Sequence, residues 1–274
     1  MIELTATREF QLPVIAECIS PDTFQGKTIQ EIADLKVWEG NKQKPLNDFF
    51  KIAESGTDDQ LEDDRITVRG DLTRVRGIGS HMKSGEILIQ GNVGMHLGAE
   101  MNGGRITVYG NAGGWVGSMM KHSTIEIHGN AGDYLASPYR GSTKGIEKGR
   151  ILVHGNVGNE AGAYMKDGII KIFGSAGQFL GLRMREGNIY VKNSCEGRAG
   201  ACMSGGKIII GGTVESILPS FTIDSVKKKT KVEEGEDAEG PFYVFLGDLA
   251  ENGDGKLYVS KTNNPQLNPY EKLL

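Results

Sequence analysis

Cysteine and histidine are the residues of this chain whose chemistry could make a catalytic or metal site. The three cysteines, Cys18, Cys195 and Cys202, form no CxxC pair, and their spacing matches neither a zinc site nor an iron–sulfur cluster. A nucleophilic cysteine needs a nearby base, and the sequence identifies none for them. No Ser/His/Asp set, HExxH sequence or phosphate-binding loop stands out either. We therefore expect no catalytic residue, no bound cofactor and no metal in this chain.

Two of the five histidines, His128 and His154, occupy the same outward position in successive units of a repeat. Their Cβ atoms should lie about 5 Å apart, because paired strands have that spacing. A metal site would need a third and a fourth ligand there, whereas the flanking units supply Tyr109 and Phe173. The sequence favours an aromatic stripe that faces a partner, and a metal site is the alternative.

Methionine also recurs at one offset, at residues 82, 101, 120, 165, 184 and 203. Thioethers can bind soft metals, but a flexible side chain that fills an irregular corner would recur in the same way. We expect a packing column, in which Tyr139 takes the place of methionine in the irregular unit.

These positions belong to a repeat with a period of 19 residues. Eight segments read variable, apolar, variable, apolar, variable, and then Gly or Asn. Their closing residues fall at positions 70, 91, 110, 129, 155, 174, 193 and 212. Such a period is typical of a solenoid, and the alternation predicts one strand per unit. We expect a mostly β protein built on a right-handed parallel β-solenoid of about eight coils, with inward columns of Ile and Val.

Glycine followed by asparagine closes four of these strands, beginning at Gly91, Gly110, Gly129 and Gly155. Glycine allows left-handed backbone angles, which we expect at Gly110 and Gly155. The asparagine side chains of adjacent coils should hydrogen-bond to one another as a ladder.

Segments without the repeat lie on both sides of it. We expect an N-terminal cap over residues 1–62, the solenoid over 63–218 and a C-terminal cap over 219–274. The N-terminal cap contains two helix-compatible stretches, Ile29–Trp38 and Leu46–Ala53. Caps are expected because an open solenoid end would leave strand edges unpaired.

The C-terminal cap begins with a charged stretch. Lys227, Lys228 and Lys229 are followed by acidic residues from Glu233 to Asp237, which predicts an exposed loop. Two short strands are then expected, at Phe242–Leu246 and Lys256–Ser260.

The charge balance gives no indication of a nucleic-acid partner. The 31 Lys and Arg residues nearly match the 35 Asp and Glu residues, which leaves a net charge of −4 and no general basic field. The N-terminal sequence lacks the features of a signal peptide, and no apolar run reaches membrane-spanning length. We expect a soluble cytoplasmic protein.

A 13-residue unit, Gly-x-x-Met-x-x-Gly-x-Ile-x-Val/Ile-x-Gly, connects the repeat to a family. It is complete at Gly98–Gly110, Gly162–Gly174 and Gly200–Gly212, with one departure each at Gly117–Gly129 and Gly181–Asn193. Over residues 65–218 the chain resembles the C subunit of formylmethanofuran dehydrogenase. The C-terminal solenoid of the glutamate synthase large subunit is related, and so is the C subunit of the bacterial formyltransferase/hydrolase complex.

The resemblance implies a scaffold subunit of a complex that reduces CO2 and attaches it as a formyl group to methanofuran, the first step of methanogenesis from CO2. Its implied partners are a tungsten- or molybdenum-pterin catalytic subunit, an amidohydrolase-like subunit that holds zinc, and iron–sulfur subunits. The alternatives are the C subunit of the non-redox formyltransferase/hydrolase complex and a free-standing β-solenoid binding module.

Two units are longer than 19 residues, one between Gly77 and Gly91 and one between Ala136 and Gly155. The second has seven extra residues, around the segment Ser137–Lys144. Extra residues on a solenoid emerge as loops, so we expect this loop to contact another subunit.

Overall fold

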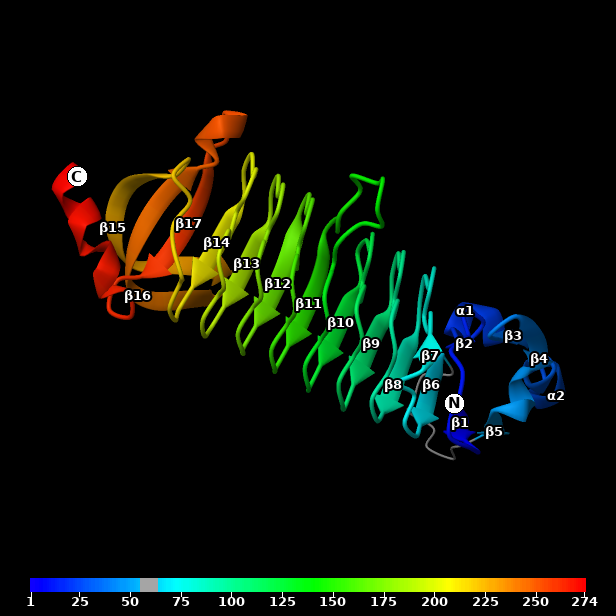
Figure 1. The fold of residues 1–274 in the computed structure, drawn as a ribbon. Coiled ribbons are helices and arrows are strands. Elements are labelled where there is room, and N and C mark those ends of the chain that lie inside the picture. The colour runs from blue at the N-terminus through cyan, green and yellow to red at the C-terminus, as the bar shows by residue number, and fades with distance from the viewer. Residues whose placement is uncertain (55–63) are drawn as a thin grey trace.

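The computed structural model describes residues 1–54 and 64–274, and this part of the chain is mostly β (Figure 1). Its strands form one sheet of 13 strands and one of 4 strands. All eight predicted repeat strands are present, side by side in the middle of the large sheet. They are β6 (Arg65–Arg69), β8 (Glu86–Gln90), β9 (Arg105–Val108), β10 (Thr124–Ile127), β11 (Gly149–Val153), β12 (Gly168–Ile172), β13 (Asn188–Val191) and β14 (Lys207–Ile210).

Each repeat strand pairs in parallel with the strand of the next repeat, and equivalent residues face each other. Ile106 of β9, for example, lies opposite Ile87 of β8 and Ile125 of β10. All three side chains are fully buried, as are their equivalents along the stack, which confirms the predicted apolar columns. A second row of parallel bridges runs from Leu72 to Val214, so each repeat meets its neighbour at two places.

Asparagine side chains form the predicted ladder beside the strands. The backbone N–H and the side-chain amide of Asn111 donate to Oδ1 of Asn92 at 2.9 and 3.1 Å. Asn130 donates to Asn111 in the same way, and the backbone N–H of Asn156 donates to Asn130 at 2.8 Å. Each side chain thus accepts bonds from the repeat that follows it.

The predicted left-handed backbone at Gly110 and Gly155 is wrong. Left-handed angles occur at the equivalent Gly70 and Gly91, but not at these two glycines. Glycine is required here because the backbone of the preceding repeat lies too close for a side chain. A Cβ on Gly110 would lie only 2.5 Å from the carbonyl oxygen of Gly91. The corner at the opposite end of the repeats does have left-handed glycine, at Gly77, Gly98, Gly117, Gly162, Gly181 and Gly200, and Ala136 adopts the same conformation in the long repeat.

The methionine column is fully buried, as predicted. Its member in the long repeat is Ile146 and not Tyr139. The N–H of Lys166 donates to the carbonyl of Ile146, just as the N–H of Lys121 donates to that of Met101. The extra residues precede Ile146. The residue 19 places after Met120 is therefore Tyr139, which lies in the loop, and the buried position of the column is taken by Ile146.

The N-terminal segment extends both sheets. Its elements are β1 (Ile2–Ala6), β2 (Val14–Ile15), α1 (Pro21–Phe24), α2 (Ile29–Ala33), β3 (Lys36–Glu39), β4 (Lys42–Pro45), the 3-10 helix η1 (Leu46–Asp48) and β5 (Phe50–Glu54). Strand β1 pairs in parallel with β6 and antiparallel with β5. The small sheet has the order β4-β3-β2-β7, and β7 (Val75–Arg76) comes from the repeat region. The predicted boundary between residues 62 and 63 lies outside the described residues.

Both predicted N-terminal helices are shorter than expected. Helix α2 starts at a capping box, in which the Thr28 hydroxyl accepts from the Glu31 N–H and the Glu31 carboxylate accepts from the Thr28 N–H. It ends at Ala33, and the last three residues of the predicted helix, Lys36–Trp38, belong to strand β3, which pairs with β2 and β4. In the second stretch, pairing with β1 makes Phe50–Glu54 a strand and buries Phe50. Contacts distant in sequence therefore outweigh local helix propensity.

The C-terminal segment ends the large sheet. It contains β15 (Thr222–Glu233), β16 (Glu236–Gly247), the 3-10 helix η2 (Leu249–Glu251), β17 (Gly255–Ser260) and the 3-10 helix η3 (Pro265–Leu273). Both predicted strands lie within β16 and β17, and β17 pairs in parallel with β14. No helix within residues 1–54 and 64–274 is long and apolar enough to cross a membrane.

The predicted charged loop is wrong, because its residues form the long antiparallel hairpin of β15 and β16. Its charged residues are interrupted by Val232 and Ala238, which are buried against the outward side chain of Ile209. The hairpin also brings Glu233 to Arg150 and to the buried Lys171, whose Nζ lies 3.1 Å from Glu233 Oε1. The hairpin is thereby attached to repeat strands far away in sequence.

The first prediction concerns close approach between repeats. Gly110→Ala should lower the free energy of unfolding by about 1–3 kcal/mol, because the new methyl group meets the backbone of Gly91 and Asn92. Urea denaturation measures this loss. Gly197→Ala is the control, since its Cβ would meet only the end of the flexible Glu215 side chain. Equal stabilities of the two variants would contradict this role of Gly110.

The second prediction concerns the hairpin contact. Hydrogen bonding to Arg150 lowers the pKa of Glu233 from 4.5 to about 2. A lowered carboxyl pKa stabilises the fold above pH 4.5, and this contribution is lost as the pH falls towards 2. Glu233→Gln should therefore be less stable than the wild type at pH 6, and the difference should shrink on acidification. Urea denaturation between pH 6 and the acid limit measures it, and a constant difference would contradict the assignment.

Candidate functional site

Four aromatic rings stack on the outward face of the large sheet, one after each of the strands β9 to β12. They belong to Tyr109, His128, His154 and Phe173, with successive ring centroids 4.9, 4.8 and 5.2 Å apart. The two imidazoles are almost parallel, at an interplanar angle of 1°. Register explains this stack, because equivalent positions of paired strands lie at about the spacing of stacked rings. The predicted alignment of the two histidines is confirmed.

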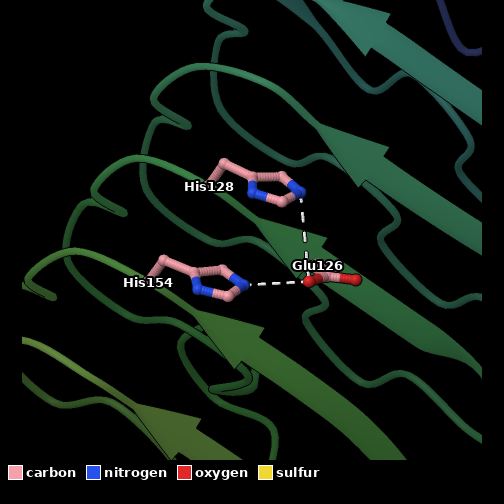
Figure 2. Close-up of side chains that lie close together, drawn as sticks. All are labelled: Glu126, His128 and His154. Atoms are coloured by element: carbon pink, nitrogen blue, oxygen red, sulfur yellow. Dashed lines mark hydrogen bonds and ion pairs between the residues drawn. The ribbon is translucent and has the colours of Figure 1, made fainter.

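Glu126 lies beside the two histidines, as Figure 2 shows. Its Oε1 is 2.8 Å from Nε2 of His154 and 3.9 Å from Nε2 of His128. Within the described ranges, this is the one group of three side chains that offers metal-ligating atoms within 4.8 Å of one another. Glu126 was not among the residues predicted from the sequence, although a residue two places before His128 on a strand must share its face.

The long loop between β10 and β11 leaves the regular stack, as Figure 1 shows. A second set of aromatic side chains lies beside this loop. The rings of His96, Trp115 and Tyr134 stack with centroids 5.6 and 4.2 Å apart. All three residues have left-handed backbone angles, which are costly for bulky side chains. Nδ1 of His96 lies 3.1 Å from the hydroxyl of Tyr139, so the loop is attached to this row of rings.

Between the loop and the rings lies a cavity of about 320 Å³. Its lining includes Trp115, Tyr134, Tyr139, Arg140, Glu160 and Tyr164. Burial lowers the pKa of His96 and raises the pKa of Tyr139, which favours a neutral pair at neutral pH. The indole Nε1 of Trp115 is buried without a hydrogen-bond partner in the described part of the chain. The aromatic side chains that line this cavity are of the types enriched at protein interfaces.

The three cysteines are free thiols in separate surroundings. Burial raises the pKa of Cys18 to about 11 and that of Cys195 to about 12, and it also raises the pKa of Cys202. A thiol must lose its proton before it acts as a nucleophile, so these environments oppose covalent chemistry.

Comparison with known proteins gives relatives with consistent names, although no protein-family model matches the chain. The C subunit of the tungsten-containing formylmethanofuran dehydrogenase 2 of Methanococcus maripaludis is 46% identical over 268 residues, which cover 94% of this chain and 96% of that protein. The C subunit of the molybdenum-containing formylmethanofuran dehydrogenase 1 of Methanothermobacter marburgensis is 48% identical over 94 residues. That alignment covers 34% of this chain but only 22% of the relative's length.

A solved structure has the same fold over nearly the whole chain. It is a chain of the formyltransferase/hydrolase complex from Methylorubrum extorquens, crystallised with methylofuran. The TM-score is 0.83 at 26% identity, and the match covers 94% of this chain and 99% of the other. The 46% identity to the Methanococcus relative over 94% of this chain means that the chain belongs to the family of formylmethanofuran dehydrogenase C subunits.

Proposed function

We propose that this chain is the scaffold subunit of a formylmethanofuran dehydrogenase complex, which reduces CO2 and attaches it as a formyl group to methanofuran. The observation that carries the proposal is the 46% identity to a dehydrogenase C subunit over 94% of the chain. The chemistry would belong to the other subunits, namely the pterin-metal, amidohydrolase-like and iron–sulfur subunits. Raised cysteine pKa values support a role without nucleophilic catalysis here.

We also propose that the repeats form a right-handed parallel β-solenoid over residues 63–218, with caps over 1–62 and 219–274. Two rows of parallel bridges between successive repeats support this architecture. Such a stack suits a scaffold, because every repeat is held at a fixed distance from the next by backbone hydrogen bonds.

The non-redox formyltransferase/hydrolase complex is the second candidate. The structural likeness to a chain of that complex, at a TM-score of 0.83, favours it. Purification of the native complex separates the two candidates. Co-purifying tungsten or molybdenum with iron–sulfur subunits would support the dehydrogenase, whereas a formyltransferase subunit without them would support the alternative.

The loop Pro138–Lys144 is our candidate contact with a catalytic subunit. Removing these seven residues would join Ser137 to Gly145 and leave Ile146 in the methionine column, so the repeat regains a 19-residue step. The stack therefore does not need the loop. Tyr139 and Arg140 belong to residue types enriched in binding hot spots, and Pro138 limits the entropy lost on docking.

The third prediction follows from this contact. Deletion of Pro138–Lys144 should leave a folded chain that no longer pulls down the other subunits. Arg140→Ala should weaken binding about tenfold, the effect of losing roughly 1.4 kcal/mol at a hot spot. Lys227→Ala removes the same charge from the exposed hairpin and serves as the control. A folded deletion variant that assembles with unchanged affinity would show that the contact lies elsewhere.

A further inference from the structure

We propose that Glu126, His128 and His154 form a binding site for one divalent transition-metal ion of the zinc class. Two imidazoles and one carboxylate are a donor set that zinc sites use when further positions are left to water or another ligand. Magnesium and calcium prefer oxygen donors alone, so the two nitrogens select against them. The expected absence of metal depended on the lack of a third ligand, and Glu126 supplies it.

The distances lie close to those a metal requires. Ligands about 2.0–2.2 Å from a tetrahedral zinc ion are separated from one another by about 3.3 Å. Oε1 of Glu126 lies 2.8 Å from one imidazole nitrogen and 3.9 Å from the other, on either side of that value. The three ligand atoms all lie within 4.8 Å, so tilting the two rings toward each other would bring them into range. Both rings are about 40% exposed, which leaves room for this rotation.

The backbone beneath the site is fixed by the sheet. Glu126 belongs to β10 and lies opposite Leu152 of β11, and His128 and His154 directly follow these two strands. Tyr109 and Phe173 stack on the outer faces of the imidazoles and oppose tilting away from each other. The three side chains are therefore gathered on one face before a metal arrives, and only the inward tilt of the two rings remains, which lowers the entropy lost on binding.

The charges around the site favour a cation. Within the described residues, Glu126 forms ion pairs only with the two histidines, and no lysine or arginine lies within 4 Å of its carboxylate. Its neighbours on the adjacent strands are the uncharged Thr107 and Leu152. The nearby Lys171 is engaged with Glu233 and Glu236 of the hairpin. The carboxylate is thus free to neutralise a metal ion.

The experiment is a zinc titration of the full chain after treatment with a chelator, followed by isothermal calorimetry. We expect one zinc ion per chain. His154→Gln and Glu126→Gln should each weaken binding about tenfold or more, because each removes a ligand while keeping the size of the side chain nearly constant. His122→Gln is the control, since His122 is exposed and outside the cluster. Thermal melting verifies that all variants are folded.

A second readout assigns the site directly. Zinc should shift the ring nitrogen NMR signals of His128 and His154 and leave those of His122 unchanged. The proposal is overturned if the wild type binds no stoichiometric zinc, or if His154→Gln and Glu126→Gln bind as tightly as the wild type. These outcomes do not depend on complex assembly, so they test the metal site separately from the scaffold role.

Discussion

In-register pairing of successive repeats is the constraint on which the rest of this structure depends. Parallel strands one repeat apart place equivalent residues opposite each other, so every feature of one repeat is copied beside itself at strand spacing. Only side chains that pack well against their own kind suit such a column. Isoleucine and valine do so in the core, asparagine does so by donating along its ladder, and the stacked rings do so on the outward face. The same constraint forbids a Cβ at Gly110, where the neighbouring backbone comes too close.

The sequence was sufficient to predict the structural features that recur in every repeat. The eight strands, their register, the buried columns and the alignment of His128 with His154 all follow from the period. Features that depend on a single repeat, or on contacts between distant segments, were not predictable in the same way. The hairpin of β15 and β16 could not be predicted without the apolar surface that it covers. Likewise, β5 could not be predicted without its pairing partner β1. The place of Ile146 in the methionine column was not predicted, because the seven inserted residues put it 26 and not 19 residues after Met120.

The candidate sites show the same division. Alternation along β10 was enough to put Glu126 and His128 on one face, but the sequence contains many such pairs, and only coordinates show that this carboxylate reaches both imidazoles. The cavity under the long loop could not be anticipated at all. Its walls come from residues such as Trp115 and Tyr164, which lie in different repeats, and from the inserted loop itself. The regular repeats thus place the three side chains of the histidine cluster, whereas the cavity exists only because one repeat carries an insertion.

The antiparallel strands at both ends of the large sheet limit the size of the particle. A parallel stack of identical registers could in principle continue from molecule to molecule into a fibre, since each end offers the template for one more strand. Here the described sheet finishes with β5 at one end and with β15 at the other, and each runs antiparallel to its neighbour. Strand β15 carries three successive lysines, and neighbouring charges of one sign disfavour the addition of a second copy. These antiparallel edge strands therefore allow a self-templating repeat to exist as a unit of defined length.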